Sequence, residues 1–218
     1  PLSSNSRSKM DDFLPLLGIV GALAVGVVSP GPSFLMVART AAAASRPDGL
    51  RAALGMGLGG LCFGAIALAG LQAVFLAVPS LYAGLKIAGG AYLCYLGWRI
   101  FMAAKTPLVV ADSTAGPAPR WRYLVLGWTT QLSNPKTAIV YASVFAAFLP
   151  PHFSLAFSML LLVAVFAIEA GWYALVALAL SAGGPRRVYL RAKTGLDRAA
   201  GCVMVALGVK LLASAWND

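Results

Sequence analysis

Long apolar stretches without charges constrain this chain more than any other feature. No charged residue lies between Asp12 and Arg39, and none lies between Arg51 and Lys86. About 20 predominantly apolar residues are enough for a helix to cross the hydrocarbon core of a bilayer. The sequence therefore predicts an all-α membrane protein with the lipid bilayer as its surroundings.

Charge content and motifs exclude several classes of protein. Only 11% of the 218 residues are charged, whereas about a quarter are charged in a soluble domain. The net charge is +10, but the basic residues form short clusters between apolar runs, so we expect no nucleic-acid partner. The three cysteines are isolated and no hydrolase or ATP-binding motif occurs, so we expect no metal site, no cofactor and no enzyme.

Turn signals divide the apolar sequence into six expected spans in a single transmembrane domain, residues 10–218. Residues 1–9 are interpreted as a remnant before a natural start at Met10. Pro-containing turns follow the second, fourth and fifth spans, and residues 105–121 are interpreted as a flexible linker. The expected spans are about 13–38, 52–77, 81–104, 123–148, 154–180 and 199–216.

The basic residues predict the orientation of these spans. Most of the 17 Lys and Arg residues fall in the first, third and fifth loops, while the fourth loop has only His152. Basic loops are retained on the cytoplasmic side. We therefore expect loops one, three and five to face the cytoplasm of a bacterial inner membrane, with both termini outside.

Two patterns of small residues predict how the helices are arranged. The motif G-L-x-x-A-x-G occurs at Gly84–Gly90 and again at Gly195–Gly201, each followed by Leu-Gly at the same distance. A three-helix repeat reverses direction, so this motif predicts two inverted three-helix repeats, as in secondary transporters. In the second span, glycines fall on two opposite helix faces, which predicts a central helix packed on both sides.

Proline breaks are expected in the counterpart spans one and four. The first span contains Pro30-Gly31-Pro32, and the fourth contains Asn134-Pro135. A proline inside a helix frees a backbone carbonyl, which in lipid needs a partner in protein or in a wet cavity. The helix that restarts exposes amides and the positive end of its dipole, which suit a carboxylate ligand.

Two charged residues lie deep in the expected spans. Lys136 is in the fourth span and Glu169 in the fifth, where each charge costs about 2.5–3.5 kcal/mol on insertion scales. One hypothesis is that Lys136 attracts a substrate carboxylate, while Glu169 attracts an ammonium group or carries a proton. The alternative is a structural Lys136–Glu169 ion pair that only joins two helices.

These motifs together resemble the lysine-exporter (LysE/RhtB) family of bacterial amino-acid translocators. The resemblance covers nearly the whole chain from Met10 and is carried by Pro30-Gly31-Pro32, Gly49–Gly60, Gly89–Gly97 and Asn134-Pro135-Lys136. It implies a six-helix inner-membrane exporter that moves an amino acid or a close derivative outward, driven by a proton or ion gradient. It does not imply a particular substrate.

Two positions depart from the pattern of this family. Many members have Asn or Asp where this chain has Ser33, and many have an acidic residue where it has Gly60. Glu169 is then the only deep carboxylate, which favours a neutral or apolar amino acid over lysine. The candidate translocation site comprises Pro30, Gly31, Pro32, Ser33, Gln131, Asn134, Pro135, Lys136 and Glu169.

Other functions fit the sequence less well. A membrane redox carrier needs two close thiols, but Cys62, Cys94 and Cys202 lie singly in different spans. A structural subunit would not need the paired breaks or the deep charges. An exporter of metals or small cations is retained as the alternative, although metal sites need clustered ligands. The sequence leaves open whether the protein forms a homo-oligomer.

Overall fold

The computed structural model describes residues 2–29, 31–77, 79–106, 119–150, 152–181 and 183–216. Within these ranges the chain forms helices and no strands, which confirms the all-α class. The helices are α1 (Leu2–Val28), α2 (Pro32–Ala43), α3 (Arg46–Ala77), α4 (Pro79–Ala103), α5 (Arg120–Leu132), α6 (Pro135–Phe148), α7 (Leu155–Leu180) and α8 (Gly183–Trp216).

The expected spans one and four are each divided into two helices in the structure. The break between α1 and α2 falls at residues 29–31, and the break between α5 and α6 falls at Ser133 and Asn134. The axes of α1 and α2 differ by 58° at their break. Among the described residues, Arg46–Gly70, Leu155–Leu180 and Arg191–Ala215 are long and apolar enough to cross a bilayer, and α1 with α2 forms a fourth, bent candidate.

Several helices are longer than the expected spans. α8 begins at Gly183 instead of about residue 199, and α3 begins at Arg46. Apolar runs mark the part of a helix inside the hydrocarbon, whereas charged turns can extend the same helix into water. Residues 2–9, which were expected to be a remnant, belong to α1. Residues 107–118, which make up most of the expected linker, lie outside the described residues.

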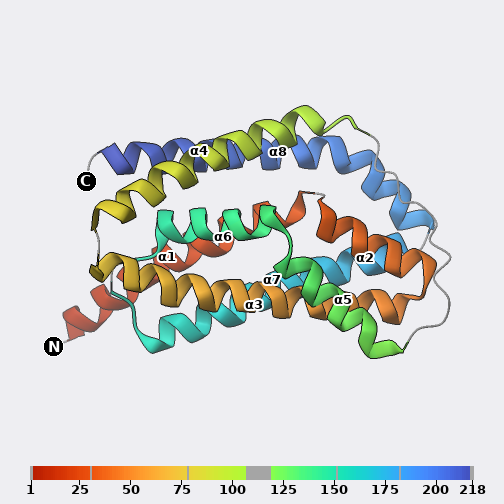
Figure 1. The fold of residues 1–218 in the computed structure, drawn as a ribbon, viewed down its shortest axis with the longest axis horizontal. Helices are drawn as coiled ribbons and strands as arrows, with labels where there is room; N and C mark the ends of the chain where they lie inside the picture. The colour runs from red at the N-terminus through yellow and green to blue at the C-terminus, as the bar shows by residue number, and fades with distance from the viewer. Residues whose placement is uncertain are drawn as a thin grey trace.

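The helices form a bundle in which α4 and α8 lie side by side on one face (Figure 1). α1 and α6 occupy the middle of this view, and α3 lies with α7 and α5 on the opposite side. α1 begins and α8 ends at the same end of the bundle. α1 and α6, one half of each broken helix, therefore lie between the other helices, whereas α5 lies at the side of the bundle against α3.

α3 is packed on both sides, as its glycines predict. A side chain at Gly55 or Gly59 would meet α5, at Leu124 and Gln131 respectively. A side chain at Gly57, Gly60 or Gly64 would instead meet residues of α7. The absence of side chains on two faces lets both neighbouring helices approach closely.

Glycines also bring the backbones of α4 and α8 together. A Cβ atom built on Gly97 would lie 2.5 Å from the carbonyl oxygen of Gly201, and one on Gly201 would lie 2.7 Å from that of Gly97. Gly90 and Gly208 form a second pair, with corresponding distances of 2.9 and 2.6 Å. No side chain larger than hydrogen fits at these positions without separating the helices.

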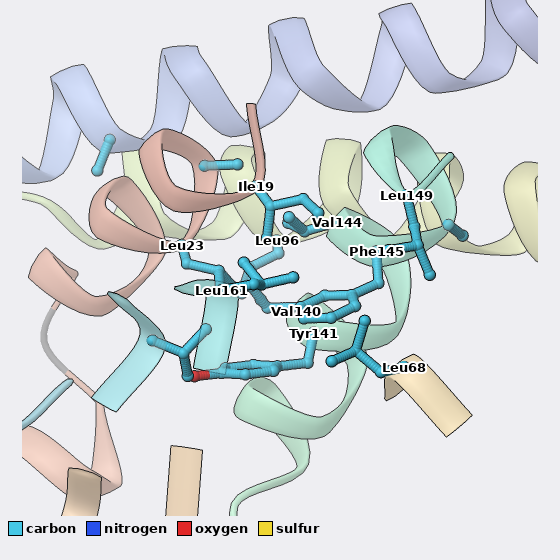
Figure 2. Packing of buried hydrophobic residues seen from close by; sticks show 14 of the residues in the cluster. Ile19, Leu23, Leu68, Leu96, Val140, Tyr141, Val144, Phe145, Leu149 and Leu161 are labelled. Atoms are coloured by element: carbon cyan, nitrogen blue, oxygen red, sulfur yellow. The ribbon is translucent and has the colours of Figure 1, made fainter. Parts of the chain in front are cut away.

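Two apolar clusters lie on either side of a polar layer. The first includes Ile19, Val144, Phe145 and Leu161, and the ring of Tyr141 stacks on that of Phe145 at its edge (Figure 2). The second is formed mainly by α2, the first half of α3 and the second half of α7. The first cluster also includes Leu96 and Ile100, which line a cavity together with Lys136.

Candidate functional site

At the first break, a lysine from another helix binds a freed backbone carbonyl. α1 ends at Val28, and the Nζ atom of Lys136 donates a hydrogen bond of 2.9 Å to the carbonyl oxygen of the buried Ser29. Pro30 lies outside the described residues. Gly31 is the N-cap of α2, with no side-chain cap, and Pro32 is its first residue. Lys136 therefore satisfies a carbonyl that the break leaves without a helical partner.

At the second break, an asparagine starts the new helix. The side chain of Asn134 accepts a hydrogen bond of 3.0 Å from the backbone N–H of Lys136, and Pro135 is the first residue of α6. α2 and α6 thus both begin with proline, which suits the first helical turn because its missing N–H has no helical partner there. The positive ends of two helix dipoles lie next to the breaks.

A hydrogen-bonded network joins the two breaks to α7. Gln131 accepts a hydrogen bond of 2.8 Å from the Ser33 hydroxyl and donates one of 2.9 Å to Oε2 of Glu169. The Tyr141 hydroxyl donates a hydrogen bond of 2.9 Å to Oε1 of Glu169. The side-chain amide of Asn134 donates one of 2.9 Å to Oγ of Ser33. We call these five residues the buried polar network, since each has no more than 4% of its surface exposed.

Lys136 and Glu169 bind different partners in this structure. The ion pairs found in the described part of the chain join Arg51 to Asp48 and Lys193 to Asp197, and none joins Lys136 to Glu169. The direct ion pair considered above is therefore not formed here. The two opposite charges remain in the same polar layer, each held by hydrogen bonds.

Gly60 is in direct contact with the buried polar network. A Cβ atom at this position would lie 2.7 Å from Cγ of Glu169 and 2.9 Å from the Tyr141 hydroxyl. Any side chain there would have to displace Glu169, because real Cβ contacts are longer. The carboxylate from α7 therefore occupies the space beside α3.

Two neighbouring cavities that share lining residues reach Lys136. The central cavity, about 20 Å³, has room for about one water and is lined by residues that include Ser29, Lys136 and Glu169. The vestibule, about 460 Å³, shares Ser29, Gly31, Asn134 and Lys136 with it and extends to Arg99, Lys193 and Asp197. The vestibule thus runs from the polar layer toward the end of the bundle that carries the basic loops.

The structure brings the described members of the candidate site together. Gly31, Ser33, Asn134, Lys136 and Glu169 line the central cavity. Pro32 and Pro135 line the vestibule, and Gln131 lies behind the cavity wall, where it holds Glu169.

Sequence reasoning missed three polar residues of the central cavity on α6 and α7. Thr137 and Tyr141 lie on α6, while Tyr173 lies on α7. Tyr141 is four residues after Thr137, and Tyr173 is four residues after Glu169, so each pair shares one helix face. This four-residue spacing is the sequence pattern from which these cavity residues could have been predicted.

Comparison with known proteins identifies the family. Residues 24–215 match the family described as LysE type translocator. The chain belongs to this family. The LysE-type translocator is therefore a membrane transporter and not an enzyme.

Its relatives include proteins named for amino-acid efflux. The threonine efflux protein of Escherichia coli (strain K12) is 28% identical over 87% of this chain and 93% of its own length. The leucine efflux protein of Klebsiella pneumoniae is 30% identical over 60% of this chain and 61% of its own length. An uncharacterized membrane protein of Pseudomonas aeruginosa is 33% identical over 91% and 97%. No solved structure matches this translocator.

Within the described residues, no three His, Cys, Asp or Glu side chains are grouped so that they could hold a metal ion.

Replacing Asn134 with alanine is expected to destabilise the translocator by about 1–2 kcal/mol, because α6 loses its N-cap. Asn134→Ser should cost less, since serine is an equally good N-cap. Thermal unfolding in detergent, followed by tryptophan fluorescence, measures the difference. Equal unfolding midpoints for the two variants would show that the cap does not stabilise α6.

Proposed function

We propose that this translocator exports a neutral amino acid across the bacterial inner membrane, driven by a proton or ion gradient. Its relatives named for threonine and leucine efflux support amino-acid export. Among the described residues that line the central cavity, Glu169 is the only one with a carboxylate, and no second one lies beside it at Gly60. This arrangement supports a substrate with one ammonium group, such as threonine or leucine, over a dibasic one.

The observation that carries this proposal is the pair of opposite charges at the central cavity. Lys136 and Glu169 line it from α6 and α7, and each is held by hydrogen bonds to other groups. A zwitterionic amino acid has complementary charges: its carboxylate would bind Lys136 and the starts of α2 and α6, and its ammonium would bind Glu169. The central cavity must widen to admit it, as expected for a site that opens alternately to each side.

The glycine pairs of α4 and α8 support two inverted repeats with six crossings. In the repeated motif, Gly90 corresponds to Gly201, and the Leu-Gly glycines that follow are Gly97 and Gly208. The observed contacts are Gly90 with Gly208 and Gly97 with Gly201. When each glycine is replaced by its counterpart in the other half, the Gly90–Gly208 contact becomes the Gly201–Gly97 contact. A two-fold axis in the membrane plane that relates the two halves would exchange the contacts in this way.

The proposed orientation places the vestibule on the cytoplasmic side. Its wall includes Arg99 and Lys193, from the third and fifth basic loops, and basic loops are retained in the cytoplasm. An exporter must receive its substrate from this side, so the structure corresponds to an inward-open state in this proposal.

An efflux assay tests the function directly. Cells loaded with a panel of labelled amino acids should release one or a few neutral ones faster when the translocator is produced, and a protonophore should slow that release. The control is a strain with an empty vector. Release of no amino acid would overturn the proposal, and loss of a loaded metal or small cation instead would favour the alternative.

A further inference from the structure

A second charged group lies at the far wall of the vestibule. Asp197 of α8 is 3% exposed, and its Oδ2 atom accepts a hydrogen bond of 2.8 Å from Lys193 Nζ. Lys193 also donates 3.2 Å to the carbonyl oxygen of Ala104, where α4 ends. Lys193 therefore fixes the Asp197 carboxylate between α4 and α8, on the surface of the vestibule.

Among the described residues, the second carboxylate oxygen of Asp197 has no partner. Its Oδ1 atom is buried and accepts no hydrogen bond from the described residues. Buried polar atoms in folded proteins nearly always have a partner, because leaving one unsatisfied is unfavourable. Asp197 lines the vestibule while Oδ1 itself is buried, so a vestibule ligand that donates a hydrogen bond to this oxygen must displace part of the wall as it binds.

A positive group lies on the same vestibule wall. Arg99 of α4 is exposed; its guanidinium carbon lies 5.8 Å from the centre of the Tyr95 ring, and a long hydrogen bond of 3.5 Å joins it to the Tyr95 hydroxyl. Both contacts are with one exposed aromatic side chain, so the remaining N–H groups of the guanidinium can bind a carboxylate through two parallel hydrogen bonds. The vestibule, at about 460 Å³, is within the size range of small-molecule sites.

We propose that Asp197 and Arg99 form a vestibule subsite, in which Asp197 Oδ1 binds the α-ammonium group of an amino acid and Arg99 binds its carboxylate. The substrate occupies this subsite first. It then moves along the vestibule to Lys136 and into the central cavity, which Lys136 and Glu169 line. This inference rests on the proposed function, because it assigns the first contact of the exported amino acid.

The surroundings of Asp197 favour an ammonium group over a metal ion. A divalent cation needs several oxygen ligands, whereas Asp197 offers one free oxygen with the positive Lys193 directly beside it. An ammonium group needs only hydrogen-bond acceptors, and its carboxylate in turn interacts favourably with Arg99.

The test measures efflux from proteoliposomes loaded with increasing concentrations of L-threonine or L-leucine, whichever the wild type carries faster. Asp197→Asn should raise the half-saturating internal concentration about tenfold or more, which corresponds to the loss of one charged hydrogen bond. The rate at saturation should stay within about twofold, because Lys136 and Glu169 are unchanged. Arg99→Gln, at an exposed position, should shift the half-saturating concentration in the same direction and tests the subsite even if Asp197→Asn fails to fold.

Asp48→Asn is the matched control. Asp48 also pairs with a basic residue, Arg51, but it does not line the vestibule. This variant removes the same charge and should export like the wild type.

Three results would overturn the subsite. The first is wild-type concentration dependence in both Asp197→Asn and Arg99→Gln, which leaves the proposed function intact. The second is an effect of Asp197→Asn that appears only with sodium present and vanishes in choline buffer, which would indicate a sodium site. The third is a wild-type protein that releases no amino acid in the efflux assay, which overturns the proposed function as well.

Discussion

Replacing Glu169 with glutamine is expected to reduce amino-acid export about 30-fold or more while the protein stays folded. The substitution removes the charge that would bind the substrate's ammonium group, and losing one partner of a buried charge pair costs about 2–5 kcal/mol. The fold should survive because glutamine keeps the shape and the hydrogen bonds. Its carbonyl can accept from Gln131, and its amide can donate to the Tyr141 hydroxyl, which also accepts.

Efflux rates and thermal unfolding, measured on the same preparation, separate function from stability. Glu169→Ala is the comparison, since it leaves the amide N–H of Gln131 and the hydroxyl of Tyr141 without an acceptor and should destabilise the protein by about 1–3 kcal/mol for each. Export at the wild-type rate by Glu169→Gln would show that the buried polar network is only structural. Lys136→Gln, measured in parallel, tests whether the positive charge at the central cavity is also needed for export.

Replacing Gly97 with valine is expected to lower stability by about 3 kcal/mol, at the upper end of the cost of overpacking. Its Cβ atom would lie 2.5 Å from the Gly201 carbonyl oxygen and 2.8 Å from the backbone nitrogen of Val205. Backbone atoms cannot rotate away as a side chain can, so α4 and α8 must separate along their contact.

Gly84→Val provides a matched control on the same helix. Outside the neighbouring backbone of α4 itself, no atom of the described residues lies within 4 Å of the Cβ position at Gly84, so valine should leave the unfolding midpoint nearly unchanged there. Fluorescence-detected size-exclusion chromatography after heating reports the midpoint of both variants. Equal midpoints would mean that α4 and α8 do not rely on close backbone contact.

The positions of the helix breaks and the faces of α3 were predictable because local chemistry determines them. Pro32 and Pro135 each begin a helix, and proline is compatible with the first turn but not with the interior. The glycines of α3 follow the helical period, so their two faces can be read from residue number alone. The structure agrees with both predictions.

The partners of Lys136 and Glu169 were not predictable, because they depend on how separate helices are arranged. The Ser29 carbonyl becomes available only through the break in α1, and Gln131 reaches Glu169 from a helix that ends before the second break. Tyr141 was overlooked because its ring resembles an ordinary core residue, and only the position of α7 reveals what its hydroxyl binds. The length of α8 was not predicted, because an apolar run indicates only the part of a helix inside the hydrocarbon and not the polar turns that extend it.

The two glycine pairs restrict where the molecule can move. Contact at Gly90 with Gly208 and at Gly97 with Gly201 brings α4 and α8 together at two points, and a slide or turn of one helix would move larger side chains into these close contacts. If α4 and α8 stay together during transport, as we expect, the rearrangement that passes a ligand across must come from the broken helices, where α2 and α6 each begin at a proline. In that case α4 and α8 form a fixed frame, and the segments on either side of each break move relative to it.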